Sequence, residues 1–306
     1  MGNAKRSSSA ARVNRDDLES VVGQIGFARR TPDERPAAVT PRGYDNFSFV
    51  DHDVTIRNAR PIVDELSLDK EGFALIQHRL SCANERDPEA FQKEYLDEMV
   101  PFIKDYFSAS RVTTADLGGV ALRSIGGDLF RRPEVEGRGA GVEIGEDAGE
   151  AGKHSVRNFG VGYAHCDYAP IAGPQIAARD SQLQGSEIRW YSRLMIIQTW
   201  CALSPPPQDL PLAFCDGSSV PETDLVVTPL TKLGEIISVW IPYYRPSHRW
   251  YYFPEMTQDE FVLFKGYDSD THYKPRSTHS AFDNRRLYPN AKPRESVETR
   301  LYVYYD

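Results

Sequence analysis

The sequence predicts a mainly β protein with the architecture of a sandwich or jelly roll. The second half of the chain is a series of segments rich in Val, Ile, Tyr, Phe and Trp, which is the composition of strands. Pro, Gly, Asp and Ser separate these segments, as turn residues separate the strands of a sandwich. No internal repeat is visible in the sequence. The predicted strands are residues 161–168, 188–203, 236–244, 250–253, 261–267, 278–282 and 297–305.

One long helix is predicted before these strands, at residues 87–107. Asp87 can cap its first turn, and Pro88 occupies the first helical position, where a missing N–H has no cost. An apolar stripe at helical spacing follows, which predicts one buried face. The stripe consists of Phe91, Tyr95, Leu96, Met99, Ile103 and Tyr106.

The composition along the chain predicts an arm and one domain. Residues 1–40 are rich in Arg, Ser, Ala and Pro without apolar periodicity, so we expect a flexible N-terminal arm. Residues 41–306 are enough for a single domain. Within it, residues 134–153 hold many Gly and Glu and almost no large apolar residue, which predicts a mobile loop where a lid could lie.

The net charge and the cysteines restrict the partners and the cellular compartment that we expect. The net charge of −8 argues against a nucleic-acid partner, which would select a basic surface. No apolar stretch reaches the length of a membrane span, so we expect no membrane association. The cysteines show no zinc-type or disulfide spacing and no export signal precedes them, which favours reduced thiols in the cytoplasm. The sequence does not indicate an oligomeric state. The cysteines are Cys82, Cys166, Cys201 and Cys215.

A histidine and a carboxylate one residue apart are the strongest chemical signal. His165 and Asp167 lie in a predicted strand, where side chains at i and i+2 share a face while Cys166 points away. About one His-x-Asp/Glu is expected by chance in this composition, so a polar pair on a sheet face is the alternative.

His279 completes a possible metal site. It begins the predicted strand at residues 278–282, and strands far apart in sequence become neighbours in a jelly roll. Two histidines and one carboxylate form the ligand face of non-haem Fe(II) oxygenases. A histidine satisfied within the core is the alternative. The other five histidines are expected to be structural or solvated; they are His52, His78, His154, His248 and His272.

The last predicted strand carries a possible carboxylate clamp. Arg294 and Ser296 are two residues apart, and a guanidinium with a nearby hydroxyl can hold a carboxylate through several hydrogen bonds. The alternative is a salt bridge among Arg294, Glu298 and Arg300.

The order His-x-Asp, distal His and Arg-x-Ser resembles the Fe(II)/2-oxoglutarate-dependent dioxygenases of the double-stranded β-helix fold. The second half is similar to the fungal gibberellin-desaturase and secondary-metabolite hydroxylase/desaturase family, which includes a cephamycin methoxylation accessory protein. The similar stretches are residues 193–203 (RLMIIQTWCAL), 211–219 (PLAFCDGSS), 249–256 (RWYYFPEM), 259–270 (DEFVLFKGYDSD), 279–282 (HSAF) and 293–300 (PRESVETR). Cys201 departs from the family, which often has an arginine there.

The resemblance implies a double-stranded β-helix (jelly roll/cupin-like) core with flanking N-terminal helices. It implies Fe(II) bound by His165, Asp167 and His279, with 2-oxoglutarate and O2 as co-substrates. Arg294 with Ser296 would clamp 2-oxoglutarate. Arg300 and Arg276 are alternatives, because the spacing from His279 to Arg294 is longer than in the common plant-type enzymes.

The implied reaction is hydroxylation or desaturation of a small secondary metabolite or carboxylate precursor. The alternatives are a catalytically silent accessory protein of the same fold and a cupin-like metallohydrolase or isomerase. The residues expected to border the substrate pocket are Tyr163, Trp200, Phe282, Arg193 and Arg276. Aromatic residues on strands more often belong to the core, which is the alternative for these three.

Overall fold

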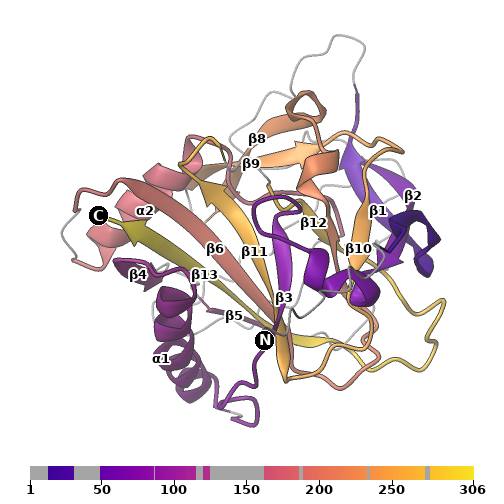
Figure 1. Cartoon of the computed structure of the whole chain (residues 1–306), viewed down its shortest axis with the longest axis horizontal. Helices are drawn as coiled ribbons and strands as arrows, with labels where there is room; N and C mark the ends of the chain where they lie inside the picture. The colour runs from indigo at the N-terminus through magenta and orange to yellow at the C-terminus, as the bar shows by residue number, and fades with distance from the viewer. Residues whose placement is uncertain are drawn as a thin grey trace, which may run out of the picture.

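Two β-sheets face each other in the computed structural model of this chain (Figure 1). The structure describes residues 13–30, 49–85, 87–114, 120–124, 162–185, 189–232, 235–272 and 276–306. The predicted loop at residues 134–153 lies outside the described residues. Among those described, no helix is long and apolar enough to cross a membrane.

The larger sheet holds the longest strand, β13, and runs in the order β3-β11-β6-β13-β4, with β5 also paired to β13. All its strand pairs in the described part are antiparallel. Strands from both ends of the sequence therefore become neighbours, as in a jelly roll. The strands are β3 (Phe73–Gln77), β4 (Arg111–Thr114), β5 (Val120–Ser124), β6 (Arg193–Ala202), β11 (Glu260–Asp268) and β13 (Glu295–Tyr305).

The second sheet runs in the order β1-β2-β10-β7-β12, and a separate hairpin pairs β8 with β9. The pairing of β10 with β2 is parallel. These strands are β1 (Ser20–Ala28), β2 (Phe49–Asn58), β7 (Leu212–Cys215), β8 (Leu225–Lys232), β9 (Glu235–Pro242), β10 (Trp250–Tyr252) and β12 (His279–Ala281). Short 3-10 turns lie at η1 (Arg15–Asp17), η3 (Arg60–Glu65), η4 (Gly217–Ser219) and η5 (Glu222–Asp224).

Aromatic side chains fill the space between the two sheets. Phe73 and Phe264 of the larger sheet pack on Phe214 of β7, with ring centroids 5.2 and 5.3 Å apart. All three are fully buried, and burial of such rings is a main source of stability. The prediction of a mainly β jelly-roll-like sandwich is confirmed.

The two faces of β6 and β13 have different partners. One face carries Met195, Ile197 and Val303, which pack against helix α1 (Pro88–Tyr106). The predicted helix is confirmed, and its Asp87 cap accepts a hydrogen bond from the Ala90 N–H at 2.8 Å. On the opposite face, Ile196 and its neighbours pack against α2 (Ala172–Leu183) at one end of the strands.

The polar residues Gln198, Glu298 and Arg300 lie on that same face as α2, further along the strands, because side chains alternate along a strand. This face therefore changes from apolar packing to a polar site between the sheets.

The prediction of a flexible arm over residues 1–40 is wrong for residues 13–30. Residues 20–28 form β1, in antiparallel register with β2, and Ile25 and Phe27 are fully buried. Residues 1–12 and 31–40 lie outside the described residues.

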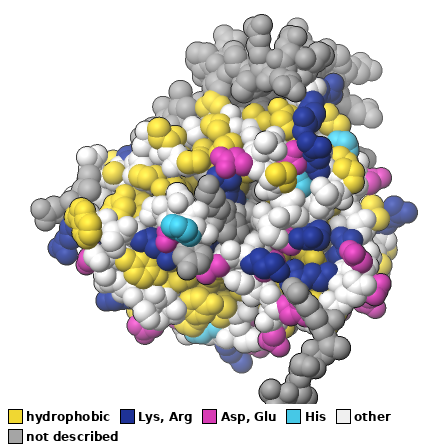
Figure 2. All heavy atoms as spheres, turned by 45° about the horizontal axis from the view of Figure 1, so that its top comes forward, with side chains coloured by type: hydrophobic (Ala, Val, Ile, Leu, Met, Phe, Trp, Pro, Cys, Tyr) yellow, Lys and Arg dark blue, Asp and Glu magenta, His cyan; other side chains and the backbone are white. Residues whose placement is uncertain are grey.

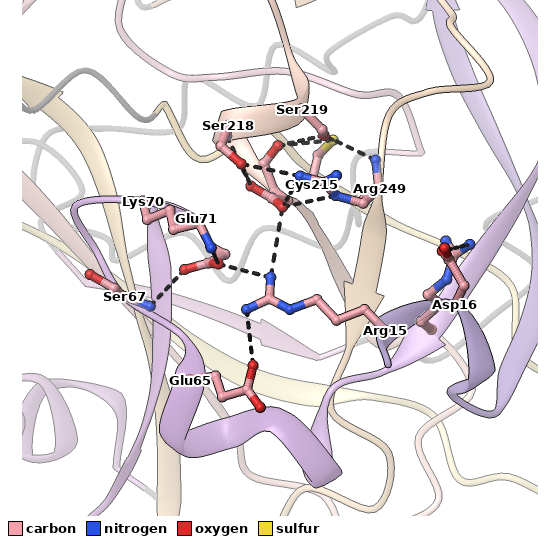
Figure 3. A network of polar contacts seen from close by, with 12 residues as sticks. Arg15, Asp16, Glu65, Ser67, Lys70, Glu71, Cys215, Ser218, Ser219 and Arg249 are labelled. Carbon is pink, nitrogen blue, oxygen red and sulfur yellow. Dashed lines mark hydrogen bonds and ion pairs between the residues drawn. The ribbon is translucent and has the colours of Figure 1, made fainter. Parts of the chain in front are cut away.

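A network of buried charges fixes the segment before β1 (Figure 3). The Arg15 guanidinium donates to Glu71 at 2.8 Å and lies 3.9 Å from Asp216 and 3.7 Å from Glu65. The side chains of Glu71 and Asp216 are completely buried, and Asp216 is also held by Arg249 at 2.8 Å. Because buried carboxylates require a positive partner, the N-terminal segment contributes to the fold.

Arg15→Met should lower the free energy of unfolding by roughly 1–3 kcal/mol, because it leaves Glu71 buried without its closest cation. The loss is smaller than for a wholly enclosed pair, since Lys70 remains 3.2 Å from Glu71. Urea denaturation measures it. Arg57→Met is the control: its partner Asp16 is 79% exposed, so a change within roughly 0.5 kcal/mol is expected. Equal losses in both variants would contradict a structural role for the Arg15 network.

Candidate metal centre

Three side chains predicted as metal ligands meet in the structure. The ligand atoms of His165, Asp167 and His279 all lie within 4.8 Å of one another. The side chains of His165 and Asp167 are 12% and 14% exposed, and His279 is 4% exposed. The cluster is thus largely shielded from solvent.

Backbone hydrogen bonds set the positions of the two histidines. The His165 N–H donates to the His279 carbonyl at 3.1 Å, and the His279 N–H donates back at 2.9 Å. Such a reciprocal pair places two residues directly opposite one another on adjacent strands, with side chains on one face. The rings accordingly lie 4.3 Å apart between centroids.

The segment that carries His165 is shared among several strands. It forms isolated bridges from Tyr163 to β1 and from Cys166 to Trp240 of β9, in place of the continuous strand predicted at residues 161–168. Residue 161 lies outside the described residues. The segment is nevertheless extended, so His165 and Asp167 share a face as expected.

The tautomers of both histidines suit a metal. Nδ1 of His165 lies 3.0 Å from the Tyr163 carbonyl oxygen, and Nδ1 of His279 lies 3.0 Å from that of Ser277. A carbonyl can only accept, so each Nδ1 carries a proton, and in the neutral ring the lone pair is then on Nε2. Burial, followed by the nearby His279, lowers the pKa of His165 to about 4, so its ring is neutral at pH 7.

The two carboxylate oxygens of Asp167 have different partners. Oδ2 accepts from Gln198 at 2.8 Å and from Arg300 at 2.7 and 3.1 Å. Oδ1 lies 3.4 Å from Nε2 of His165. Burial alone would raise the pKa of Asp167, but Arg300 and the two histidines hold that pKa well below its usual range. The group is therefore an anion, and two imidazole nitrogens with one anionic oxygen fit a divalent iron.

A small cavity of about 30 Å³ adjoins these ligands. Its polar side includes Arg294 and, from β13, Glu298 and Arg300. Its apolar side consists of Trp200 of β6, Leu212 of β7 and Ala281 of β12. The lining residues are His165, Trp200, Leu212, His279, Ala281, Arg294, Glu298 and Arg300.

Arg294 is the buried cation of this cavity. It is 1% exposed, its guanidinium lies 5.8 Å from the Trp200 ring centroid, and Nη1 donates to the Leu210 carbonyl at 2.7 Å. The backbone N–H of Arg294 is fixed by Asp209 at 2.8 Å. Ser296, two residues on, has a buried hydroxyl without a hydrogen-bond partner in the described part of the chain. Ser296 is not among the residues that line the cavity, whereas a buried cation in the cavity wall fits a bound carboxylate.

The other predicted arginines have different partners. Arg300 reaches the cavity, but its guanidinium is engaged by Asp167 and, at 2.7 Å, by Glu298. Arg193 forms a two-hydrogen-bond pair with Asp268, at 2.9 and 2.6 Å. Arg276 lies over Trp240 and 3.8 Å from Glu222. Neither Arg193 nor Arg276 lines the cavity.

The three aromatic residues predicted to border the substrate pocket also differ in their positions relative to the cavity. Trp200 lines the cavity. The Tyr163 ring lies beside the metal ligands, 5.1 Å from that of His165. Phe282 is fully buried against Tyr252, with ring centroids 5.4 Å apart, and is a core residue. The structure therefore does not bring Phe282 to the cavity.

Sequence reasoning missed Gln198, Leu212 and Ala281, and it treated Glu298 only as a salt-bridge partner. The sequence did contain a signal for Gln198. With Thr199 it interrupts the otherwise apolar segment 194–202, and its side chain lies on the same face of the strand as that of Trp200. Of the remaining histidines, His52, His78, His248 and His272 contact other side chains, and His154 lies outside the described residues.

A sandwich with two histidines and one carboxylate between its sheets defines a non-haem metalloprotein. The family described as Oxidoreductase/YMDC permease-like domain matches residues 25–304, and the chain belongs to this family.

Relatives of this chain include fungal dioxygenases and hydroxylase/desaturases. The Fe(II)/2-oxoglutarate-dependent dioxygenase nvfI of Aspergillus novofumigatus is 27% identical, over 90% of this chain and 92% of that protein. The hydroxylase/desaturase efuI of Hormonema carpetanum is 29% identical, over 83% of each chain.

A solved structure shows the same fold. It is that of the iron and α-ketoglutarate-dependent endoperoxidase NvfI, which superposes with a TM-score of 0.71 over 94% of this chain and 98% of that chain, at 23% identity.

His279→Ala should abolish stoichiometric binding of Fe(II), because it removes one of the three protein ligands to the metal. Isothermal titration under anaerobic conditions measures this. His272→Ala is the control, since the His272 side chain is 88% exposed and pairs only locally with Asp270. Retained binding in His279→Ala would show that His279 is a core residue only.

Proposed function

We propose that this chain is a non-haem Fe(II)/2-oxoglutarate-dependent dioxygenase that hydroxylates or desaturates a small secondary metabolite or carboxylate precursor. The observation that carries the proposal is the placement of the triad His165, Asp167 and His279 beside a cavity that contains the buried Arg294. The names of the relatives support the same activity. When bound, Fe(II) with 2-oxoglutarate and O2 supplies oxidation of an unactivated C–H bond, with decarboxylation of 2-oxoglutarate to succinate.

The residues of this chain would bind the metal, hold 2-oxoglutarate and line the cavity. The two Nε2 atoms and Asp167 would hold the metal on one side of the cavity. Arg294, with the hydroxyl of Ser296, would hold the far carboxylate of 2-oxoglutarate. Trp200, Leu212 and Ala281 would exclude water from the reacting centre.

A small, uncharged or anionic organic substrate is part of the proposal, and so is a cytoplasmic location. On the face in Figure 2, basic side chains gather in places with acidic side chains beside them, so the charge there is mixed. All four cysteines are free and buried, as suits a reducing compartment.

Arg294→Gln should weaken binding of 2-oxoglutarate by roughly 2–5 kcal/mol, because a buried carboxylate loses its charged partner. Fe(II) affinity should change little, since the hydrogen bonds of Arg294 to Asp209 and Leu210 involve none of the three ligands. Equilibrium binding of each ligand measures both effects. Arg193→Gln is the matched control, since Arg193 pairs with Asp268 outside the cavity. An unchanged 2-oxoglutarate affinity in Arg294→Gln would move the role to Arg300, the other arginine that lines the cavity.

The reaction is tested by succinate release. Amino-acid, terpenoid and polyketide acids are screened with Fe(II), 2-oxoglutarate and O2, and we expect at least one to stimulate succinate formation above the uncoupled rate. Stimulation only by a protein or an oligonucleotide would contradict the proposed substrate class. No stimulation by any compound would favour a catalytically silent accessory protein, and turnover without 2-oxoglutarate would favour a cupin-like metallohydrolase or isomerase.

A further inference from the structure

Two side chains from neighbouring strands converge on a single oxygen of Asp167. Gln198 of β6 donates through Nε2 at 2.8 Å, and Arg300 of β13 donates through Nη2 at 2.7 Å and Nε at 3.1 Å. All three contacts are to Oδ2. No hydrogen bond in the described part of the chain is made to Oδ1, whose near neighbour is Nε2 of His165.

The sheet register builds this arrangement. Gln198 and Arg300 are directly opposite each other in the antiparallel pair of β6 and β13, which run side by side in Figure 1. Opposite residues have Cβ atoms about 5 Å apart on the same face, so the two donors are held at a fixed separation by the backbone ladder. Asp167 arrives from a different segment and fits between them.

In the described part of the chain, only the N–H end of the Gln198 side chain makes a hydrogen bond. It is completely buried, and its Oε1 has no hydrogen-bond partner in the described part of the chain. An unsatisfied buried acceptor is destabilising, and an apolar side chain in this position would avoid that cost. What the glutamine adds is the bond to Asp167.

The neighbouring strand β11 leaves space for this glutamine. The β11–β6 register shifts between Lys265 and Tyr267, and Gly266 lies at the irregularity. A Cβ at Gly266 would come within 2.6 Å of Gln198 Oε1 and 2.8 Å of the Tyr168 ring. The bulge and the missing side chain therefore accommodate Gln198 beside Asp167.

Arg300 is fixed from its other side. Its Nη2 also donates to Glu298 at 2.7 Å, and the Arg300 side chain is 16% exposed. The guanidinium thus lies between two carboxylates in a largely enclosed site, where a charge-assisted contact has a defined geometry.

We propose that Gln198 and Arg300 are positioning residues that together hold Oδ2 of Asp167, so that Asp167 offers only Oδ1 to the metal. This inference rests on the proposed function, because it assumes that the triad binds a metal. A carboxylate that binds through one oxygen occupies one coordination position. Three protein ligands then leave three positions of an octahedral ion for co-substrates.

The experiment uses Co(II) as the probe, with the full-length protein. Co(II) affinity is measured by isothermal titration, and its visible absorption spectrum reports the number and arrangement of ligands. Gln198→Leu and Arg300→Met should each weaken Co(II) binding by roughly 10–100-fold, as loss of residues that orient metal ligands does. Each should also change the spectrum, because Oδ2 is released toward the ion.

Two further variants separate positioning from general destabilisation. Arg193→Met removes an ion pair from the same strand β6, at a site away from the cavity, so it should leave Co(II) affinity and spectrum unchanged. Arg300→Lys keeps the charge and one donor, so its affinity should lie between those of the wild type and Arg300→Met. If Arg300→Met does not fold, as thermal unfolding will show, Arg300→Lys and Gln198→Leu carry the test.

The outcomes distinguish the inference from the proposed function. A wild-type protein that binds neither Co(II) nor Fe(II) overturns the proposed function. A wild type that binds Co(II), with folded Gln198→Leu and Arg300→Lys that bind it as tightly or more tightly and with the same spectrum, overturns the positioning role alone. Weakened binding in both variants with an unchanged Arg193→Met supports it.

Discussion

The two backbone hydrogen bonds between His165 and His279 are the interaction on which the site depends. They join a short extended segment to the edge strand β12, and they bring together two residues that are far apart in the sequence. Every other part of the site is placed relative to this pair. Asp167 follows His165 by two residues, and β12 is held against β7 by the pairing of His279 with Phe214. A change that separated these segments would remove the ligand cluster without altering any ligand.

Strands β6 and β13 contribute both to the core and to the site, because their two faces have different neighbours. One face packs against α1 mainly through apolar side chains, with the Thr199 hydroxyl 2.7 Å from the hydroxyl of Tyr95 of the helix. The other face is apolar where α2 covers it and polar where it meets Asp167. The buried charges at that point are tolerated because they are paired: Arg300 lies between Asp167 and Glu298, and the metal would add a further positive charge beside Asp167. The strands that stabilise the core thus also orient the ligand.

The sequence allowed prediction of those parts of the site that depend on local spacing. The same-face relation of His165 and Asp167 follows from two-residue periodicity, and helix α1 follows from its cap and stripe. The role of Arg300 could not be predicted in this way. Its position on the polar face of β13 is visible in the sequence, but its partner Asp167 comes from a segment whose placement depends on long-range pairing. For the same reason, Arg193 was expected near the substrate, whereas Asp268 of the adjacent strand β11 neutralises it.

The strand β1 was missed for a different reason. Glycines at positions 23 and 26 interrupt the alternation of its apolar residues, and the surrounding residues have the composition of a flexible tail. Both glycines are close to other groups: a Cβ at Gly23 would meet the Phe282 ring at 2.8 Å, and one at Gly26 would meet Tyr163 at 3.2 Å. Their absence of side chains permits close packing next to the metal segment, which composition alone does not reveal.

The central claim is that one metal and 2-oxoglutarate bind together at His165, Asp167 and His279. An anaerobic optical titration of the full-length protein with Fe(II) and then 2-oxoglutarate tests it most directly. We predict a metal-to-ligand charge-transfer band that appears only when both are present and saturates at one equivalent of iron per chain. Stoichiometric iron binding without such a band at saturating 2-oxoglutarate would contradict the claim.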